Sequence, residues 1–173
     1  MEKVLVTGAS GYIAEHCIVE LLKNGYAVKG SLRNMERENE VRDAIKKETQ
    51  DDNLEFCQLD LLSDDGWDDA MWDCDYLMHV ASPFTIDAPK DENELIKPAK
   101  EGTLRALNAA KKAGIKKVVL TSSTAAISSH MKGGTADHDT WTDIDSEYVT
   151  AYQKSKTIAE KAAWEFILSL IHI

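Results

Sequence analysis

Cysteine is scarce in this sequence of 173 residues. The three cysteines, Cys17, Cys57 and Cys74, lie far apart and form no C-x-x-C pair. An odd number of isolated cysteines indicates neither a zinc site nor a disulfide framework. We therefore expect small, buried thiols in a protein of a reducing compartment.

Long apolar segments and an excess of positive charge are also lacking. No stretch reaches the roughly 18 apolar residues of a membrane span, and the N-terminus lacks a charged segment followed by a cleavable apolar one. The 20 Lys and Arg against 30 Asp and Glu give a formal charge of -10, which argues against nucleic acid and anionic lipid as partners. We expect a cytoplasmic protein.

No internal repeat, linker or low-complexity tract interrupts the chain, of which 43% is hydrophobic and 29% charged. These values are typical of one soluble globular domain, so we expect a single domain over residues 1–173. Apolar runs with β-branched residues recur at 4–7, 26–32, 54–59, 76–81 and 118–122, separated by segments of helical spacing. Strands that alternate with helices predict an α/β fold with a parallel sheet.

Helices are expected between these strands. The segment 12–24 has its apolar residues largely on one side, namely Ile13, Cys17, Val19, Leu21 and Leu22, and Asn24-Gly25 ends it. Residues 35–50 are dense in charge and predict an exposed helix. Residues 91–113 predict a longer helix that Pro98 starts or kinks.

A loop of small and polar residues is expected from Ser123 to Ser146. A loop of that length in a compact domain is usually functional, and we expect the substrate there. A last helix should begin at Asp145 or Ser146, natural N-cap residues, and pass Trp164. The loop and its flanks also contain His130, Asp137, His138 and Asp139. Their spacing matches no set of metal ligands, so we expect a polar loop and no metal.

The most informative segment is the apolar run at the N-terminus, which breaks into a glycine loop and continues as an amphipathic segment. Gly8 would turn the chain sharply at the end of the first strand, and Gly11 would let the backbone approach a pyrophosphate. Ala14 would keep the first helix close to the sheet. Phosphates would then bind the free N–H groups of a helix N-terminus. The alternative is an ordinary glycine turn between a strand and a helix.

The end of the second strand lacks an acid. A dinucleotide without a phosphate on its adenosine ribose is usually read there by Asp or Glu, but this sequence has Arg33-Asn34. A guanidinium matches phosphate geometry well, so NADP is favoured over NAD, and Arg37 could help. The alternative is that Arg33 is a solvated charge at the end of a strand.

Two further strand ends face the same edge of the sheet. Asp60-Leu61 follows the third strand, where Asp60 could accept a hydrogen bond from an adenine amino group or could cap a helix. After the fourth strand, Ala81 and Ser82 would pass the ribose of the cofactor. His79 lies within an apolar strand, so we interpret it as a core or strand-end residue and not as a base.

A hydroxyl, a phenol and an ammonium follow in the last third of the chain. Ser123 ends the fifth strand, and Tyr152 and Lys156 share one helix face because they are four residues apart. Reduction of a carbonyl needs an oxygen that is polarised early and protonated late. Tyr152 can donate the proton, Lys156 can favour the ionised phenol and hold the nicotinamide ribose, and Ser123 can donate a hydrogen bond to the carbonyl oxygen.

Together these motifs resemble the extended short-chain dehydrogenase/reductases, in the branch of dihydroflavonol reductases, cinnamoyl-CoA reductases and NADPH-dependent aldehyde or ketone reductases. The resemblance covers residues 2 to 168 and rests on Thr7 to Ala14, Arg33, Asp60-Leu61, His79 to Pro83, Pro98 to Thr103, Val118 to Ser123 and Tyr152 to Lys156.

The resemblance implies a Rossmann-type, doubly wound parallel sheet with about five strands present. It implies the catalytic trio Ser123, Tyr152 and Lys156, and the ligand NADP or NADPH. The predicted cofactor contacts are Thr7, Gly8, Ser10, Gly11, Tyr12, Ile13, Arg33, Asp60, Leu61, Ala81, Ser82, Tyr152 and Lys156. The substrate would be a small carbonyl compound or alcohol.

The chain departs from this family in its length. Members continue beyond the Tyr/Lys helix with further strands and a smaller substrate domain, whereas this chain ends in an apolar segment, 167–173. We expect a C-terminal truncation or a foreign tail, and hence weak NADP binding and little turnover. The alternatives are an NAD-dependent nucleotide-sugar epimerase or dehydratase, which Ala99 disfavours because that branch often has Asn there, and a non-catalytic NADP(H)-binding module.

Overall fold

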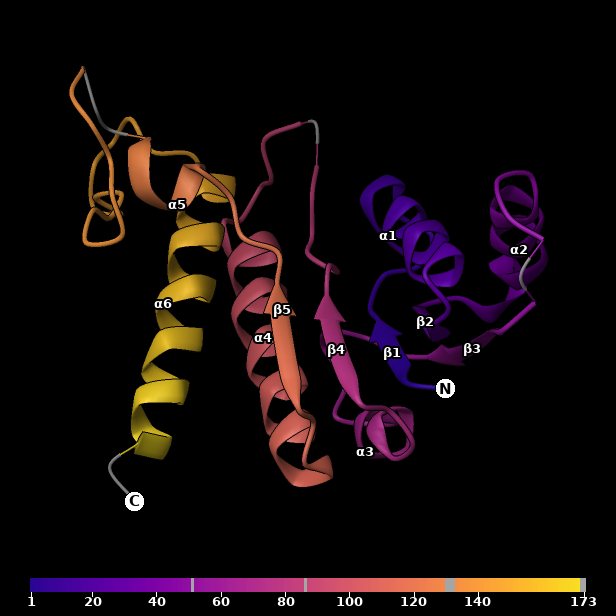
Figure 1. Ribbon diagram of the computed structural model, residues 1–173. Helices are drawn as coiled ribbons and strands as arrows, with labels where there is room; N and C mark the ends of the chain where they lie inside the picture. The colour runs from indigo at the N-terminus through magenta and orange to yellow at the C-terminus, as the bar shows by residue number, and fades with distance from the viewer. Residues whose placement is uncertain (51, 86, 130–132, 172–173) are drawn as a thin grey trace. The chain divides into compact units, whose positions relative to one another are not determined.

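The computed structural model describes residues 1–50, 52–85, 87–129 and 133–171. Along the chain (Figure 1) its elements are β1 (Lys3–Val6), α1 (Tyr12–Lys23), β2 (Ala27–Leu32), the 3-10 helix η1 (Met35–Arg37), α2 (Glu38–Lys46), β3 (Leu54–Gln58), α3 (Trp67–Met71), β4 (Tyr76–His79), α4 (Asn93–Ala113), β5 (Lys117–Leu120), α5 (Ala125–Ser128) and α6 (Ala151–Ile171). The chain divides into two compact units, Met1–Ala81 with Arg105–Thr121 and Ser82–Leu104 with Ser122–Ile173.

Five parallel strands form one sheet in the first unit, in the order β3-β2-β1-β4-β5 (Figure 1). Lys3 of β1 lies opposite Ala27 of β2, and Val4 lies opposite Tyr76 of β4. The strand order reverses at β1, and ligands of open α/β sheets bind outside the carboxyl ends of the strands at such a point. The predicted strands are confirmed, with ends shifted by one or two residues.

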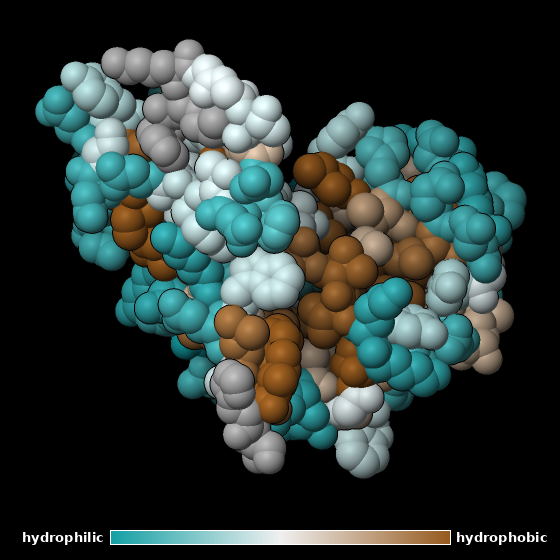
Figure 2. Space-filling model, turned by 60° about the vertical axis from the view of Figure 1, so that its left-hand side comes forward, coloured by the Kyte–Doolittle hydropathy of each residue, from teal (hydrophilic) through white to brown (hydrophobic). Residues whose placement is uncertain are grey.

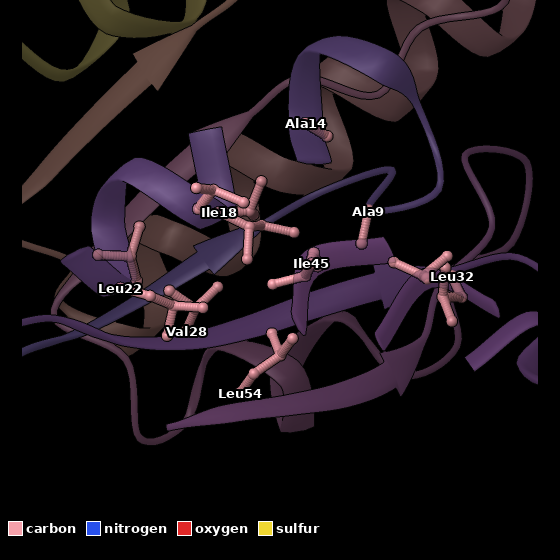
Figure 3. Packing of buried hydrophobic residues seen from close by; sticks show 12 residues of the cluster. Ala9, Ala14, Ile18, Leu22, Val28, Leu32, Ile45 and Leu54 are labelled. Carbon is pink, nitrogen blue, oxygen red and sulfur yellow. The ribbon is translucent and has the colours of Figure 1, made fainter. Parts of the chain in front are cut away.

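Helices cover both faces of this sheet. Successive side chains of β1 point to opposite faces, and those of Val4, Leu5 and Val6 are all apolar, so both faces have to be buried. Val4 and Val6 belong to a cluster with α1 and α2, in which Figure 3 labels Ala9, Ala14, Ile18, Leu22, Val28, Leu32, Ile45 and Leu54. Leu5 belongs to a second cluster that includes Trp67, Met71, Leu77, Ala106 and Ala110 from β4, α3 and the last part of α4. The doubly wound architecture is thus confirmed.

The buried face of α1 differs from the predicted one. Ala14, Ile18 and Leu22 are buried, whereas Ile13 is 56% exposed. Residues four apart share one side of a helix, and small Ala14 at the first turn lets this stripe approach the sheet. Ala14 therefore keeps the helix close to the sheet as expected. Of the residues predicted to share one side, Val19 and Leu22 are buried, whereas Ile13 is not.

The three cysteines are free thiols, but they are only partly buried, so the expectation of buried residues was wrong in degree. Burial raises the pKa of the Cys57 and Cys74 thiols to about 11. Because the thiolate is the reactive form of cysteine, these two thiols are inert near neutral pH.

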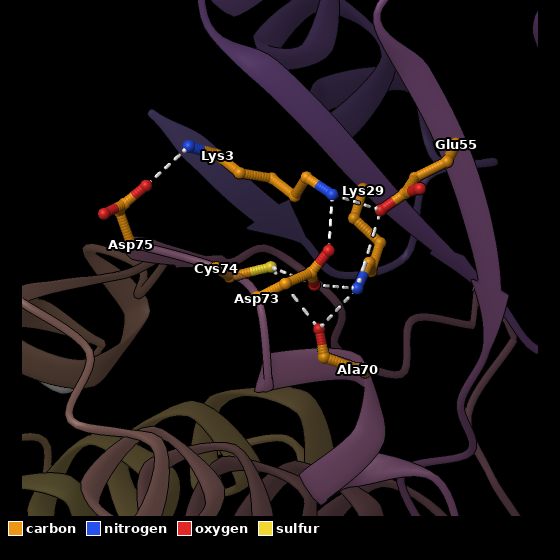
Figure 4. A network of polar contacts seen from close by, with 7 residues as sticks. All are labelled: Lys3, Lys29, Glu55, Ala70, Asp73, Cys74 and Asp75. Atoms are coloured by element: carbon orange, nitrogen blue, oxygen red, sulfur yellow. Dashed lines mark hydrogen bonds and ion pairs between the residues drawn. The ribbon is translucent and has the colours of Figure 1, made fainter. Parts of the chain in front are cut away.

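Two lysines and two acids form a polar network beside the second cluster (Figure 4). The Nζ atom of Lys3 lies 2.9 Å from Glu55 Oε1 and 2.5 Å from Asp73 Oδ2. Lys29 also pairs with Asp73 and donates to the Ala70 carbonyl at 3.3 Å. Burial alone would raise the pKa of the Asp73 carboxyl, but hydrogen bonds from Lys29 and Lys3 outweigh it and lower that pKa to about 2.

The second unit contains α5, α6 and the first part of α4. The predicted helix over 91–113 is confirmed as α4, with Pro98 inside it, and Gly114 follows it with φ of +69°. The predicted loop 123–146 was wrong at residues 125–128, which form the single turn α5. Residues 130–132 lie outside the described residues.

Helix α6 begins five residues later than Ser146. Thr150 N donates to Gln153 Oε1 at 2.7 Å, and Gln153 N donates to Thr150 Oγ1 at 3.3 Å. This reciprocal pair is a capping box, which satisfies two backbone amides at a helix start. It makes Thr150 the N-cap residue and corrects the expected start at Asp145 or Ser146.

Several apolar side chains of α6 reach solvent. Trp164 is 55%, Leu168 51% and Ile171 69% exposed. On the face of the molecule drawn in Figure 2, hydrophobic surface (brown) lies next to hydrophilic surface (teal). Within the described ranges, no helix is both long and apolar enough to cross a membrane.

Candidate functional site

The glycine loop joins β1 to α1 in the predicted way. Gly8 adopts φ of +73°, a conformation that favours glycine, and Gly11 N donates to Gly8 O at 2.9 Å. Gly11 is the N-cap of α1, and it makes no side-chain cap hydrogen bond at this end of the helix. Among the residues that the structure describes, the amides of Tyr12, Ile13 and Ala14 at the first turn therefore have neither an intrahelical nor a side-chain acceptor. They fit a phosphate group, which also gains from the positive end of the helix dipole.

Strand β2 holds the loop in place. Gly8 N donates to Ser31 Oγ at 3.1 Å, and Ala9 N donates to Ser31 O at 2.8 Å. A Cβ atom on Gly30 would lie 2.9 Å from the Cβ of Ala9. The sequence reasoning missed both Ser31 and Gly30, although a glycine inside a strand is a known signal of close backbone approach.

The Thr7 hydroxyl ties the loop to the end of β4. Thr7 is 1% exposed. Its Oγ1 accepts from the backbone amides of Val80 and Ala81 at 3.0 Å each and lies 2.9 Å from His79 Nδ1. His79 is 3% exposed and its ring meets Trp67 edge to face. The interpretation of His79 as a core residue is confirmed.

The Arg33 guanidinium lies at the carboxyl end of β2 and is exposed. No hydrogen bond or ion pair joins it to any residue that the structure describes. Arg37, in contrast, donates two hydrogen bonds to Glu40, at 2.9 and 2.8 Å. Arg33 therefore fits the phosphate that distinguishes NADP, and Arg37 fits it less well.

Asp60 caps a turn rather than a helix. Its Oδ1 accepts from Leu62 N at 2.8 Å, and α3 begins only at Trp67. The carbonyl of the next residue, Leu61, accepts from Arg105 Nη1 at 2.8 Å. Asp60 thus stands at the end of β3 with one carboxylate oxygen engaged by the backbone.

Tyr152 and Lys156 meet on the first turns of α6. The Nζ atom of Lys156 lies 5.9 Å from the centre of the Tyr152 ring. Lys156 is 7% exposed, and burial lowers the pKa of its ammonium. Within the described part of the chain, neither this ammonium nor the Tyr152 hydroxyl has a hydrogen-bond partner. The Phe84 ring packs edge to face on Tyr152, with 5.5 Å between ring centres, a contact that sequence reasoning missed.

Ser123 precedes α5. Its Oγ accepts from Ala125 N at 3.1 Å, and its carbonyl accepts from Ala126 N at 2.9 Å. Because a hydroxyl also has one donor hydrogen, Ser123 can still donate to a ligand. Helix α5 packs against α6, which carries Tyr152 and Lys156.

The predicted site residues divide between the two units. Ser82, Ser123, Tyr152 and Lys156 lie in the second unit, and the other predicted cofactor contacts lie in the first. His130, from the polar loop, lies outside the described residues. Within the described ranges no three His, Cys, Asp or Glu side chains gather in a way that could hold a metal.

The sequence model of the NAD dependent epimerase/dehydratase family matches residues 4–169 of this chain. The chain belongs to that family. Its sequence is 40% identical over 171 residues to cinnamoyl-CoA reductase CAD2 of Medicago truncatula, covering 95% of this chain and 52% of that protein. It is 35% identical over 170 residues to dihydroflavonol 4-reductase of Hordeum vulgare, covering 94% of this chain and 48% of that protein.

Solved structures of reductases have the same fold. Yeast methylglyoxal/isovaleraldehyde reductase Gre2 in complex with NADPH aligns with a TM-score of 0.84 and 32% identity, covering 98% of this chain and 54% of that chain. Vestitone reductase from alfalfa aligns with a TM-score of 0.80 and 28% identity, covering 98% of this chain and 53% of that chain.

These similarities confirm the resemblance to reductases and the Rossmann-type fold. The expected nicotinamide cofactor is confirmed at the level of the family, through its NAD-dependent description and the NADPH complexes of similar structures. The chain spans about half the length of the relatives it matches.

Proposed function

We propose that this chain carries the cofactor-binding and catalytic residues of an NADPH-dependent carbonyl reductase. The enzyme would reduce a small aldehyde or ketone to an alcohol and would oxidise the alcohol in reverse. The observation that carries this proposal is that the centre of the Tyr152 ring lies 5.9 Å from the buried Lys156 ammonium on one face of α6, with no hydrogen-bond partner for the Tyr152 hydroxyl among the described residues. The reductase activities named for similar proteins support it.

The first unit, in this proposal, binds the cofactor. The free amides of Tyr12 and Ile13 would hold the pyrophosphate, and Arg33 would hold the additional phosphate of NADPH. Asp60 would bind the adenine. Thr7 would shape the loop from inside the protein, because its hydroxyl already has three internal contacts.

The second unit would carry the proton chemistry. When bound, NADPH supplies the hydride that the carbonyl carbon receives. Ser123 donates a hydrogen bond that orients the carbonyl oxygen, and Tyr152 transfers its phenolic proton to that oxygen as negative charge develops there. The Lys156 charge favours the resulting phenolate, and its N–H groups would hold the ribose. One carbonyl, one hydride and one proton give one alcohol.

The remaining expectations extend this proposal. Residues 1–173 would form one NAD(P)-binding domain, located in the cytoplasm. The 173-residue chain alone would bind NADP weakly and turn over slowly, because its relatives are about twice as long.

The test measures NADPH and NADH oxidation with a panel of aldehydes and ketones, for the protein at the length that its gene encodes and for the 173-residue chain. Tyr152→Phe should lower kcat by at least about a hundredfold and leave NADPH affinity, followed by fluorescence, within about twofold of the wild type. Tyr26→Phe, in the first unit, is the matched control.

Four other results would overturn the proposal or part of it. An unchanged rate in Tyr152→Phe would refute the role of the phenol. Tightly retained NAD with activity on nucleotide sugars would favour an epimerase, and NADPH binding without turnover of any substrate would favour a binding module. Rapid aldehyde reduction by the 173-residue chain would refute the expectation of slow turnover.

A further inference from the structure

A side-chain hydrogen bond joins the segment that carries Ser123 to α6. Ser122, the residue before Ser123, donates a hydrogen bond from its Oγ to Oε2 of Glu160. This contact is partly buried. The other carboxylate oxygen of Glu160, Oε1, accepts from Trp164 Nε1 at 3.4 Å. Glu160 is thereby held from two sides, by Ser122 and by Trp164 of its own helix.

Glu160 lies on the same face of α6 as the two proposed catalytic residues. It follows Lys156 by four residues and Tyr152 by eight. An α-helix advances 3.6 residues per turn, so residues at these spacings form one row along the helix. The contact between Ser122 and Glu160 therefore holds Ser122 and the adjoining Ser123 to the helix face that carries Tyr152 and Lys156.

Ser123 is fixed on its other side by the start of α5. Its Oγ accepts from Ala125 N at 3.1 Å, which leaves only the hydroxyl hydrogen to be directed. The backbone of Ser123 is thus held through Ser122 on one side and through Ala125 on the other. A hydrogen bond to a carboxylate is about twice as strong as one between neutral groups, so Glu160 is the stronger of these two constraints.

We propose that Glu160 is a positioning residue for the reduction, because its carboxylate holds Ser122 and so places the Ser123 hydroxyl relative to Tyr152 and Lys156. The inference rests on the function proposed above. It predicts that Glu160 affects the rate of the chemical step more than the binding of the cofactor. A misplacement of about 1 Å can reduce a rate a hundredfold.

The experiment uses the protein at its full encoded length and its best aldehyde substrate, with NADPH varied to separate kcat from KM. Ser122→Ala and Glu160→Ala should each lower kcat by about tenfold or more and leave the KM for NADPH within about twofold. Ser122→Ala/Glu160→Ala should be no slower than either single variant, because both remove one contact. Glu160→Gln keeps an acceptor oxygen and should recover most of the rate. Glu165→Ala, at an exposed position of the same helix, is the matched control.

The following outcomes would contradict the inference or the function on which it rests. Wild-type kcat in Ser122→Ala would overturn it, as would losses that multiply in the double variant or a loss equally large in Glu165→Ala. If Glu160→Ala fails to fold by circular dichroism, Ser122→Ala and Glu160→Gln decide. A low rate in Tyr152→Phe with a normal rate in Glu160→Ala would leave the proposed function standing without this inference. A normal rate in Tyr152→Phe would refute the proposed function itself.

Discussion

A Cβ atom on Gly8 would lie 3.0 Å from the Cβ and 3.1 Å from the Cα of Ala81. Gly8 also adopts φ of +73°, so both conformation and space exclude a side chain. Gly8→Ala should lower the free energy of unfolding by about 2–3 kcal/mol. It should also weaken NADPH binding, because the strained loop carries the amides at the start of α1. Denaturant unfolding and a fluorescence titration measure the two effects.

Gly25 provides the matched control. It has φ of +80°, but a Cβ atom there would meet nothing within 4 Å. Gly25→Ala should therefore cost only the conformational strain, about 1 kcal/mol, and leave NADPH affinity unchanged. Equal losses of stability in the two variants would contradict the role of the contact with Ala81.

The preference for NADPH should depend on Arg33. Its exposed guanidinium has no partner among the described residues, so an additional phosphate meets an uncompensated charge. Arg33→Gln should weaken NADPH binding by about tenfold and change NADH binding by less than twofold. Arg37→Gln should have a smaller effect, because Glu40 already binds that guanidinium at 2.8 Å. Titrations with both cofactors check this, and equal losses for NADPH and NADH would refute a phosphate contact.

Features that depend on local pattern were predicted well. The five strands follow from apolar runs bounded by turns, and the φ of +73° at Gly8 follows from a glycine placed directly after a strand. Tyr152 and Lys156 share a face because helical periodicity alone brings residues four apart together. In each case the information lies within a few neighbouring residues.

Features that depend on contacts between distant segments were not predicted. The side of α1 that is buried carries Ala14, a small residue that allows the helix to lie close to the sheet. The spacing of the large apolar residues alone does not identify this side. Ser31 supports the glycine loop from β2, and Glu160 binds Ser122 across 38 residues of sequence. The start of α6 is a different case, because the Thr150-x-x-Gln153 capping box was present in the sequence and was overlooked.

Asp73 should contribute to acid sensitivity. Its folded-state pKa of about 2 lies below the ordinary value of 3.8, since Lys29 and Lys3 bind the carboxylate. A carboxyl with a lowered folded-state pKa stabilises the fold above its unfolded pKa, and this contribution is lost as the pH falls from about 4 through 2. Asp73→Asn should reduce stability at pH 7 by about 1 kcal/mol and by much less near pH 2.

Urea unfolding at pH 7, 4 and 2.5 measures this difference. Asp68→Asn is the control, since Asp68 pairs with Lys112 on the surface at 3.0 Å and should leave the shape of the pH dependence unchanged. The explanation is wrong if the free energies of unfolding of Asp73→Asn and the wild type differ by the same amount at every pH.

The buried Lys156 ammonium should increase kcat and decrease the stability of the fold without cofactor. Burial lowers the pKa of this ammonium from the ordinary 10.5, so the charged form is less favoured in the folded protein. This cost is present in full below the folded-state pKa and disappears as the pH rises past 10.5. Lys156→Met removes the charge while keeping a flexible chain. It should raise Tm at pH 7 by about 3 °C and lower kcat by about a hundredfold or more.

Thermal unfolding with and without saturating NADPH distinguishes this explanation from general changes in packing. Without cofactor, Lys156→Met should be the more stable protein. With cofactor the difference should shrink or reverse, because only the wild type gains ammonium contacts on binding. Lys100→Met, at an exposed position of α4, should change stability by less than about 0.5 kcal/mol. A lower Tm for Lys156→Met without cofactor would show that the buried ammonium stabilises the fold and would contradict this explanation.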